Sequence, residues 1–199
     1  TPYGGKTQIT LPDGTAVWLN SGSSIVYPDR YKNERVVTLN GEAYFDVTKQ
    51  KKPFKVKSAF GDVEVLGTRF NVKAYEGENF VTTLESGSVV FTSPQGKKVA
   101  LQPGSQVTFD TKNITTAKVE TEIFTSWKDG KLIFRNEPLQ NIITRLERWY
   151  NVDIKLKDDK LKDLKYNGTI EMETFSEVLE LIKVTTPIKY SFDRNTRVL

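Results

Sequence analysis

The sequence predicts two domains, an all-β N-terminal domain over residues 1–121 and a small α+β domain with the order β-α-β-β-α-β over residues 122–199. Up to about residue 115, short runs of alternating apolar and polar residues are separated by turn residues, which is typical of strands. Between Leu139 and Tyr150 the apolar residues instead follow the period of an α-helix. Such a change of period in a chain of 199 residues favours two small domains over one large domain.

A leucine followed within three residues by a glycine recurs before expected strands of the first domain. The glycine supplies the positive φ that a hairpin or bulge needs, and the leucine ends a strand with an inward side chain. Repeated steps of this kind predict a two-layer sandwich or a short solenoid-like stack, and their irregular spacing favours the sandwich. The steps lie at Leu11–Gly14, Leu39–Gly41, Leu84–Gly87 and Leu101–Gly104.

The first helix is expected to begin in the turn that contains Pro138 and to end before Asn151, and six of its apolar side chains share one face at the i, i+3, i+4, i+7 spacing. Pro138 suits the first helical turn, and Asn136 or Glu137 stands where a capping residue would be. Asn151 suits a left-handed residue that ends the helix. The apolar face consists of Leu139, Ile142, Ile143, Leu146, Trp149 and Tyr150.

A second helix is expected from Thr174, because Thr174 and Glu177 match the spacing of a capping box. Its inward face would consist of Phe175, Val178, Leu179 and Ile182. Four strands are expected around the two helices, which gives a split α+β layer. They are Leu132–Phe134, Val152–Leu156, Leu164–Ile170 and Ile188–Phe192.

The composition excludes several kinds of functional site. The chain has no cysteine and no histidine, which excludes disulfides, thiol chemistry and Cys/His zinc sites. No paired acids stand in a context that would tune their pKa values, so we expect no enzyme and no cofactor. Asp158 and Asp159 could bind a metal ion, but nothing nearby completes a cage and a solvated loop is favoured. The net charge of +4 comes from mixed charges, which does not fit a nucleic-acid binder.

Two features of the first domain allow a functional interpretation beside a structural one. The stretch Lys49–Lys57 carries five lysines and could contact an anionic surface, although a basic loop that enters a strand is favoured. A group of aromatic residues could stack on sugars, although aromatics that alternate within strands more often form the core. This group consists of Trp18, Tyr27, Tyr31, Tyr44 and Tyr75. A carbohydrate-binding β module is therefore the alternative function, and an exposed Trp18 or Trp127 beside a groove would favour it.

The dipeptide Gly67-Thr68 also allows two interpretations. The structural one is a pair of strands bent at Gly67. In the chemical one, the Thr68 hydroxyl attacks the preceding carbonyl of a strained peptide, which would allow self-processing without histidine or cysteine. Gly67 and Thr68 are therefore the candidate self-processing bond.

No apolar run approaches the ~18 residues that a membrane span needs, and no signal peptide begins the chain. We therefore expect Thr1 to begin the trimmed soluble part of a longer protein, without its export signal or membrane anchor.

Eight short stretches, in this order along the chain, carry a resemblance to a known family. In the first domain they are Thr1–Gly4, Leu11–Asn20, Ser24–Pro28, Gly41–Val47, Val65–Val72 and Leu84–Val90, and in the second they are Phe134–Leu139 and Arg148–Val152. The first six resemble the periplasmic region of FecR-type anti-sigma factors, and the second half resembles the secretin/TonB short N-terminal-like domain that follows it. The resemblance covers nearly the whole chain.

The resemblance implies a signalling protein and not an enzyme. Such a protein is periplasmic and anchored to the inner membrane, and its expected partner is the signalling domain of a TonB-dependent outer-membrane transporter. It binds its sigma factor only through a cytoplasmic segment that is absent from these residues. Some members of the family are processed at a Gly-Thr bond, which Gly67-Thr68 matches.

An open α+β sheet presents edge strands whose free backbone groups can pair with a partner's edge. We therefore expect the transporter's signalling domain to dock on two of the predicted strands. The candidate partner-binding residues are Val152, Ile154, Leu156, Ile188, Tyr190 and Phe192.

Overall fold

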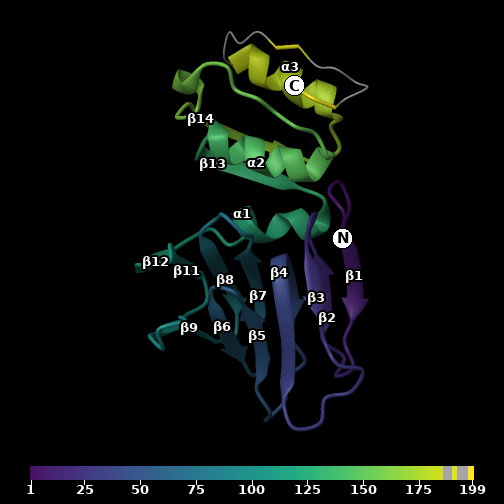
Figure 1. Ribbon diagram of the computed structural model, residues 1–199, viewed down its shortest axis with the longest axis vertical. Coiled ribbons are helices and arrows are strands. Elements are labelled where there is room, and N and C mark those ends of the chain that lie inside the picture. Colours follow the sequence, from purple (N-terminus) through teal and green to yellow (C-terminus); the bar gives the residue numbers. More distant parts are fainter. Residues whose placement is uncertain (186–189, 192–196) are drawn as a thin grey trace.

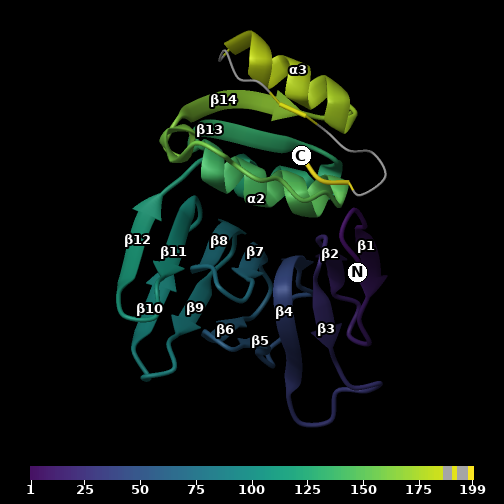
Figure 2. The same cartoon turned by 45° about the horizontal axis from the view of Figure 1, so that its top comes forward.

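The structure, a computed structural model, describes residues 1–185, 190–191 and 197–199. A β-rich region comes first and a smaller region of helices and two strands follows (Figure 1). Figure 2 shows helix α2 lying between the β-rich region and the two-stranded sheet, with helix α3 beyond that sheet. The division at residue 121 stays a prediction.

The β-rich region is one curled sheet of twelve strands that bends at its longest strand, β4 (Arg35–Asp46). Residues 35–40 of β4 pair with β3 and β5, and residues 41–46 pair with β2 and β7. Gly41 lies at this change of partners with a φ of +96°, and a Cβ there would lie 2.4 Å from Ser23 Oγ. The two halves of the predicted sandwich therefore share a strand instead of forming separate sheets.

The other strands of the sheet lie on the two sides of β4. On the side of its second half the sheet contains β1 (Thr7–Thr10), β2 (Ala16–Leu19), β7 (Arg69–Ala74), β8 (Phe80–Ser86), β11 (Ser105–Phe109) and β12 (Ile114–Lys118). On the side of its first half the sheet contains β3 (Ser24–Val26), β5 (Phe54–Ser58), β6 (Gly61–Val65), β9 (Val89–Thr92) and β10 (Lys98–Leu101).

The core of the β-rich region lies inside the curl and is built on phenylalanines. Phe45 stacks on Phe70 with 5.1 Å between ring centroids, and Phe80 stacks on Phe91 at 4.8 Å. Phe54 joins the first pair at 5.9 Å from Phe45. All five side chains are fully buried, so the alternation in the sequence correctly predicts inward-facing positions.

The second region begins with helix α1 (Glu122–Thr125) and the 3-10 helix η1 (Ser126–Asp129). Strand β13 (Leu132–Pro138), helix α2 (Leu139–Tyr150), the 3-10 helix η2 (Asp159–Leu161), strand β14 (Lys165–Ile170) and helix α3 (Phe175–Thr185) follow. Strands β13 and β14 pair antiparallel. The coarse prediction, a β-rich region followed by a small α+β region, is confirmed.

The start of α2 differs from the prediction, because strand β13 continues to Pro138. Pro138 is itself the capping residue and has an extended ψ of 139°, while Asn136 lies in a bulge with a φ of +49°. No side chain caps the helix. Instead, the N–H groups of Leu139 and Gln140 donate to the carbonyls of residues 164 and 162 at 2.7 and 3.1 Å. These carbonyls accept from helix N–H groups that a capping side chain would otherwise bind.

The end of α2 and the start of α3 are as predicted. Asn151 has a φ of +52° and ends α2 in the left-handed conformation. The Thr174 N–H donates to Glu177 Oε2 at 2.7 Å, and the Glu177 N–H donates to Thr174 Oγ1 at 3.4 Å. This reciprocal pair is the expected capping box.

Two of the four predicted strands of the second region differ from the prediction or cannot be compared. Among the residues that the structure describes, Val152–Leu156 pairs through one isolated parallel bridge, between Asp153 and Val198, and is not a continuous strand as predicted. The N–H groups of Val152 and Ile154 point away from residues 197–199. They donate to the backbone carbonyl and the side chain of Glu147 in α2, so they are not available to pair with another strand. The predicted strand Ile188–Phe192 lies mostly outside the described residues, and residues 190–191 have no regular structure.

Candidate functional site

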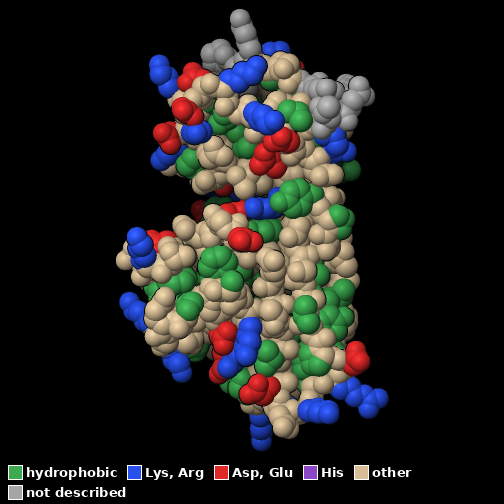
Figure 3. Space-filling model, in the orientation of Figure 1, with side chains coloured by type: hydrophobic (Ala, Val, Ile, Leu, Met, Phe, Trp, Pro, Cys, Tyr) green, Lys and Arg blue, Asp and Glu red, His purple; other side chains and the backbone are tan. Residues whose placement is uncertain are grey.

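The β-rich region meets α1, η1 and α2 at a contact that we term the seam. A cleft of about 440 Å³ lies at this seam. Strands β7 and β8 and the turn between them form one wall, and α2 forms the other. Figure 3 shows the surface hollowed between the two regions, with charged side chains inside the hollow.

The floor of the cleft is a chain of polar contacts. Glu42 on β4 accepts hydrogen bonds from Asn20 Nδ2 at 2.7 Å and from Asn71 Nδ2 at 2.8 Å. Asn71 Oδ1 accepts the indole N–H of Trp127 at 3.0 Å. Because Asn71 is buried within β7, its two bonds satisfy polar groups that would otherwise be costly to bury. One amide therefore joins the second region to the β-rich sheet.

Trp127 is packed and not available for stacking on a sugar. Only 3% of its surface is exposed, and it packs with Tyr44, Leu132 and Leu146 in a cluster that spans the seam. Trp18 is half-buried, and its ring meets the edge of Tyr44 at 5.6 Å. Packing of both tryptophans is what the signalling interpretation expects.

The aromatic group does not form one exposed surface. Tyr44 and Tyr75 are buried, Tyr31 is half-buried and Tyr27 is exposed. The carbohydrate alternative is therefore not favoured.

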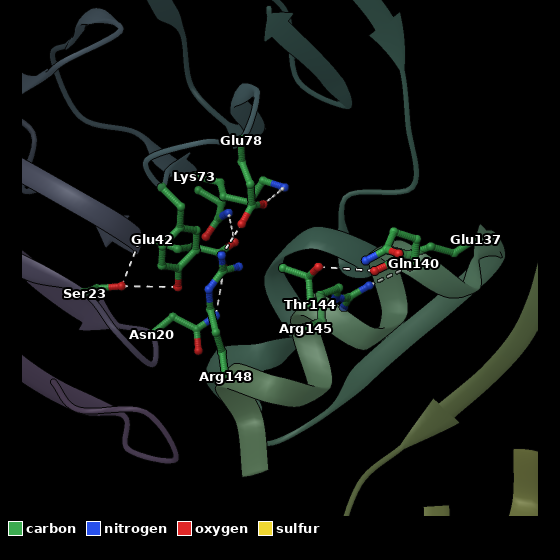
Figure 4. A network of polar contacts seen from close by, with 12 residues as sticks. Asn20, Ser23, Glu42, Lys73, Glu78, Glu137, Gln140, Thr144, Arg145 and Arg148 are labelled. Atoms are coloured by element: carbon green, nitrogen blue, oxygen red, sulfur yellow. Dashed lines mark hydrogen bonds and ion pairs between the residues drawn. The ribbon is translucent and has the colours of Figure 1, made fainter. Parts of the chain in front are cut away.

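The side wall of the cleft carries an ion cluster centred on Arg148 of α2. Its guanidinium donates to Glu78, which also pairs with Lys73 at 3.1 Å (Figure 4). The same guanidinium lies 3.7 Å from the centroid of the Tyr75 ring. Burial tends to raise the pKa of Glu78, but Lys73 and Arg148 outweigh burial and hold that pKa below its ordinary value. The ion cluster therefore keeps its charges and ties α2 to the turn after β7.

Tyr75 and Tyr44 are phenols that resist ionisation in the folded chain. The Tyr75 hydroxyl donates to the Ser21 carbonyl at 2.7 Å, and the Tyr44 hydroxyl donates to Glu85 at 2.8 Å. Burial raises both pKa values far above their ordinary value of 10.0. The neutral phenols therefore stabilise the fold below pH 10, and this stability is lost as pH rises toward the folded-state pKa values.

We expect a spectrophotometric titration at alkaline pH to show Tyr44 and Tyr75 ionising only together with unfolding. The variants Tyr44→Phe and Tyr75→Phe should each remove one such late step from the absorbance change at 295 nm. Circular dichroism recorded on the same samples gives the unfolding transition. Complete ionisation of all 8 tyrosines near pH 10 in a folded chain would contradict this expectation.

The first three predicted partner-binding residues, Val152, Ile154 and Leu156, do not form an exposed edge. Val152 is buried against Phe175 and Leu179, while Ile154 and Leu156 are half-buried. The described N–H groups of Asp153 and Lys155 already donate to the carbonyls of residues 197 and 199.

The remaining candidates lie near α3 or outside the described residues. Tyr190 is 37% exposed, and its hydroxyl donates to Glu180 of α3 at 2.6 Å. Ile188 and Phe192 lie outside the described residues. The role of the whole set in partner binding stays a prediction.

The Gly67-Thr68 bond lies in a bend that close packing explains. A Cβ on Gly67 would lie 2.6 Å from the Lys49 Cα, so only glycine fits. The Thr68 side chain is buried, and its hydroxyl donates to the Ser88 carbonyl at 2.9 Å. The bond's cleavage stays a prediction.

Two other candidates have structural explanations. Along Lys49–Lys57 the residues Phe54 and Val56 point into the core while Lys57 is exposed, as expected of a basic loop that enters a strand. Asp158 accepts the Lys160 N–H at 3.0 Å and so caps η2. Within the described part of the chain, no group of three or more acidic, histidine or cysteine side chains is placed to hold a metal ion.

Sequence reasoning missed the seam itself. Asn71 and Glu42 alternate within strands like any polar residue, and Arg148 resembles an ordinary cation at a helix end. Asn71 itself carries no distinctive signal, because it lies with Arg69 and Lys73 on the face of β7 opposite to the core-facing Phe70, Val72 and Ala74. Among the helices that the structure describes, none combines the length and apolar character of a membrane span.

Comparisons with known proteins identify the family. The family model of the FecR protein matches residues 1–90, and the model of the FecR C-terminal region matches residues 131–199. A 1.65 Å crystal structure of a candidate anti-sigma factor from Parabacteroides distasonis ATCC 8503 is 32% identical, with a TM-score of 0.90, over 100% of this chain and 95% of that chain. A second structure of such a protein from the same organism, at 2.50 Å, is 33% identical with a TM-score of 0.89 and the same coverage. No curated protein matches the chain. The chain therefore belongs to the FecR family and is of the FecR anti-sigma factor type.

Proposed function

We propose that this chain is the periplasmic sensor part of a membrane-anchored anti-sigma factor. It relays the ligand-bound state of a TonB-dependent outer-membrane transporter to an extracytoplasmic-function sigma factor through contacts between proteins. Family membership supports the regulatory role, and the transporter, the periplasmic location and the inner-membrane anchor are the finer part of the proposal. Sigma-factor binding belongs to a cytoplasmic segment outside these residues.

The observation that carries the proposal is the similarity over the whole chain to a candidate anti-sigma factor, with a TM-score of 0.90. A likeness that includes both regions and their relative placement supports a shared mode of action. The second region would be the receiver, because helix α3 and the bend before it expose large apolar side chains. Met172, Leu181 and Val184 are 94%, 52% and 85% exposed. Met172 and Val184 are the two most exposed large apolar side chains among the described residues, and exposed apolar groups of this kind can form protein contact surfaces.

The first test is calorimetric titration of this chain with the signalling domain of the TonB-dependent transporter encoded beside it. We expect micromolar or tighter binding, which Val184→Asp should weaken at least about tenfold by placing a charge in an apolar contact. Val26→Asp is the matched control, since Val26 is 69% exposed but lies on β3 in the β-rich region.

The outcome separates the parts of the proposal. Absence of binding to every transporter domain tested would contradict the relay. If the chain binds and neither Val184→Asp nor substitutions at Ile154, Leu156 and Tyr190 weaken the binding, the relay stands but the second region is not the receiver.

A further inference from the structure

Residues 1–6, which we term the N-terminal strap, bind the β-rich region next to the seam. The Gly22 N–H donates to the Pro2 carbonyl at 3.3 Å, and Ser21 Oγ donates to the Gly5 carbonyl at 2.9 Å. The fit is close, because a Cβ on Gly22 would lie 2.4 Å from Tyr3 Cε1. The strap is therefore held in one position against the turn after β2.

The same strap binds the last turn of α2 and the helix η1. The Gly4 N–H donates to the Arg148 carbonyl at 2.7 Å, where the helix end leaves carbonyls unpaired. Lys6 Nζ lies 3.6 Å from the centroid of the Trp149 ring and donates to the Trp127 carbonyl at 3.3 Å. Figure 2 shows the purple N-terminal segment passing from beside β1 to the end of α2.

One turn of α2 therefore holds the strap and the β-rich wall at once. The Arg148 carbonyl accepts from the strap, while its guanidinium binds Glu78 and stacks on Tyr75. The Tyr75 hydroxyl in turn donates to the carbonyl of Ser21, whose own hydroxyl donates to the strap. These contacts close a ring, so α2 cannot shift at this end without breaking contacts of the strap or of the β-rich wall.

We propose that the N-terminal strap is the output element of the sensor, released when α2 is displaced at the seam. Its role in signalling rests on the proposed relay, but the physical coupling does not. A partner that moves α2 would weaken the Gly4 and Lys6 contacts, and a pull on the strap would weaken the hold on α2 by the same free energy.

Hydrogen–deuterium exchange of the whole chain tests the coupling without any partner. In Arg148→Ala, amides of residues 3–6 and 20–23 should exchange about tenfold faster, since loss of the Glu78 and Tyr75 contacts frees the end of α2. The matched control is Arg145→Ala, one turn earlier on α2, because Arg145 binds Glu137 and the Ile133 carbonyl and does not contact the strap. Its effect on the strap should be absent.

A cysteine pair keeps the test decisive if Arg148→Ala loosens the whole fold. A Cβ on Gly4 would lie 3.4 Å from Asn151 Cβ, close to the span of a disulfide, and the natural chain has no cysteine. Gly4 and Asn151 both have a positive φ, so the same cysteine pair in a chain that keeps Arg148 is the reference for the strain that the pair itself adds. In Arg148→Ala carrying Gly4→Cys and Asn151→Cys, oxidation should return strap exchange to the rate of the oxidised cysteine pair in a chain that keeps Arg148, and reduction should release it again.

Two results would overturn the inference: strap exchange that stays unchanged in Arg148→Ala, or an equal rise in Arg145→Ala. Failure of the coupling leaves transporter binding untouched. Conversely, a chain that binds no transporter domain can still show the coupling, so the two proposals fail separately.

Discussion

Replacing Arg35 with methionine is expected to lower the free energy of unfolding by about 3–5 kcal/mol, the usual cost of removing one partner of a buried ion pair. Arg35 is 1% exposed at the start of β4. Its Nη1 donates to Asp13 Oδ2 and to the Thr48 carbonyl, both at 2.9 Å, and its Nε donates to the Lys52 carbonyl at 2.9 Å. The substitution leaves the Asp13 carboxylate, with 5% of its side chain exposed, without its cation.

Urea denaturation followed by circular dichroism measures this loss. Arg69→Met is the matched control, because Arg69 is half-exposed and pairs with Glu85 at 3.6 Å, so its loss should be under about 1 kcal/mol. Asp13→Asn added to Arg35→Met should recover part of the stability by removing the unpaired charge. A loss for Arg35→Met no larger than that of the control would show that the buried pair contributes nothing.

Replacing Trp127 with alanine should destabilise the chain by about 3–5 kcal/mol, the range for truncating a buried aromatic residue. The indole fills the cluster that spans the seam and donates to Asn71, so the loss falls on the contact between the two regions. We expect thermal unfolding to separate into two transitions, with the helical signal lost before the β signal.

Trp127→Phe tests the hydrogen bond alone, since it keeps most of the apolar volume. It leaves Asn71 Oδ1 buried without a donor and should lower stability by about 1–3 kcal/mol. Circular dichroism recorded at helix-sensitive and strand-sensitive wavelengths follows both variants. One cooperative transition at the wild-type temperature in Trp127→Ala would contradict a role of Trp127 in joining the regions.

Local patterns in the sequence correctly predicted the elements that depend on near neighbours. The apolar face of α2 follows from the helical period, and the Thr174–Glu177 capping box depends on groups three residues apart. The inward phenylalanines of the β-rich region likewise follow from alternation along strands.

The errors arose where distant segments decide the local structure. Carbonyls of residues 162 and 164 satisfy the first N–H groups of α2. In the described residues, Val152–Leu156 pairs through one bridge with Val198, and its Val152 and Ile154 N–H groups donate to Glu147 of α2 instead of to a second strand. The curl of the sheet depends on β4 pairing with different strands along its length, which no local pattern encodes.

The sequence by itself determined the family, the two kinds of region and the absence of cysteine and histidine chemistry, because each depends on composition or on short spacings. Only the tertiary structure decided the seam. Glu42, Asn71 and Trp127 are far apart in the chain, and so are Gly4 and Arg148, yet each set is joined by hydrogen bonds of 2.7–3.0 Å. Such pairs leave no periodic signal, since their contact arises only when packing of both regions brings their surfaces together.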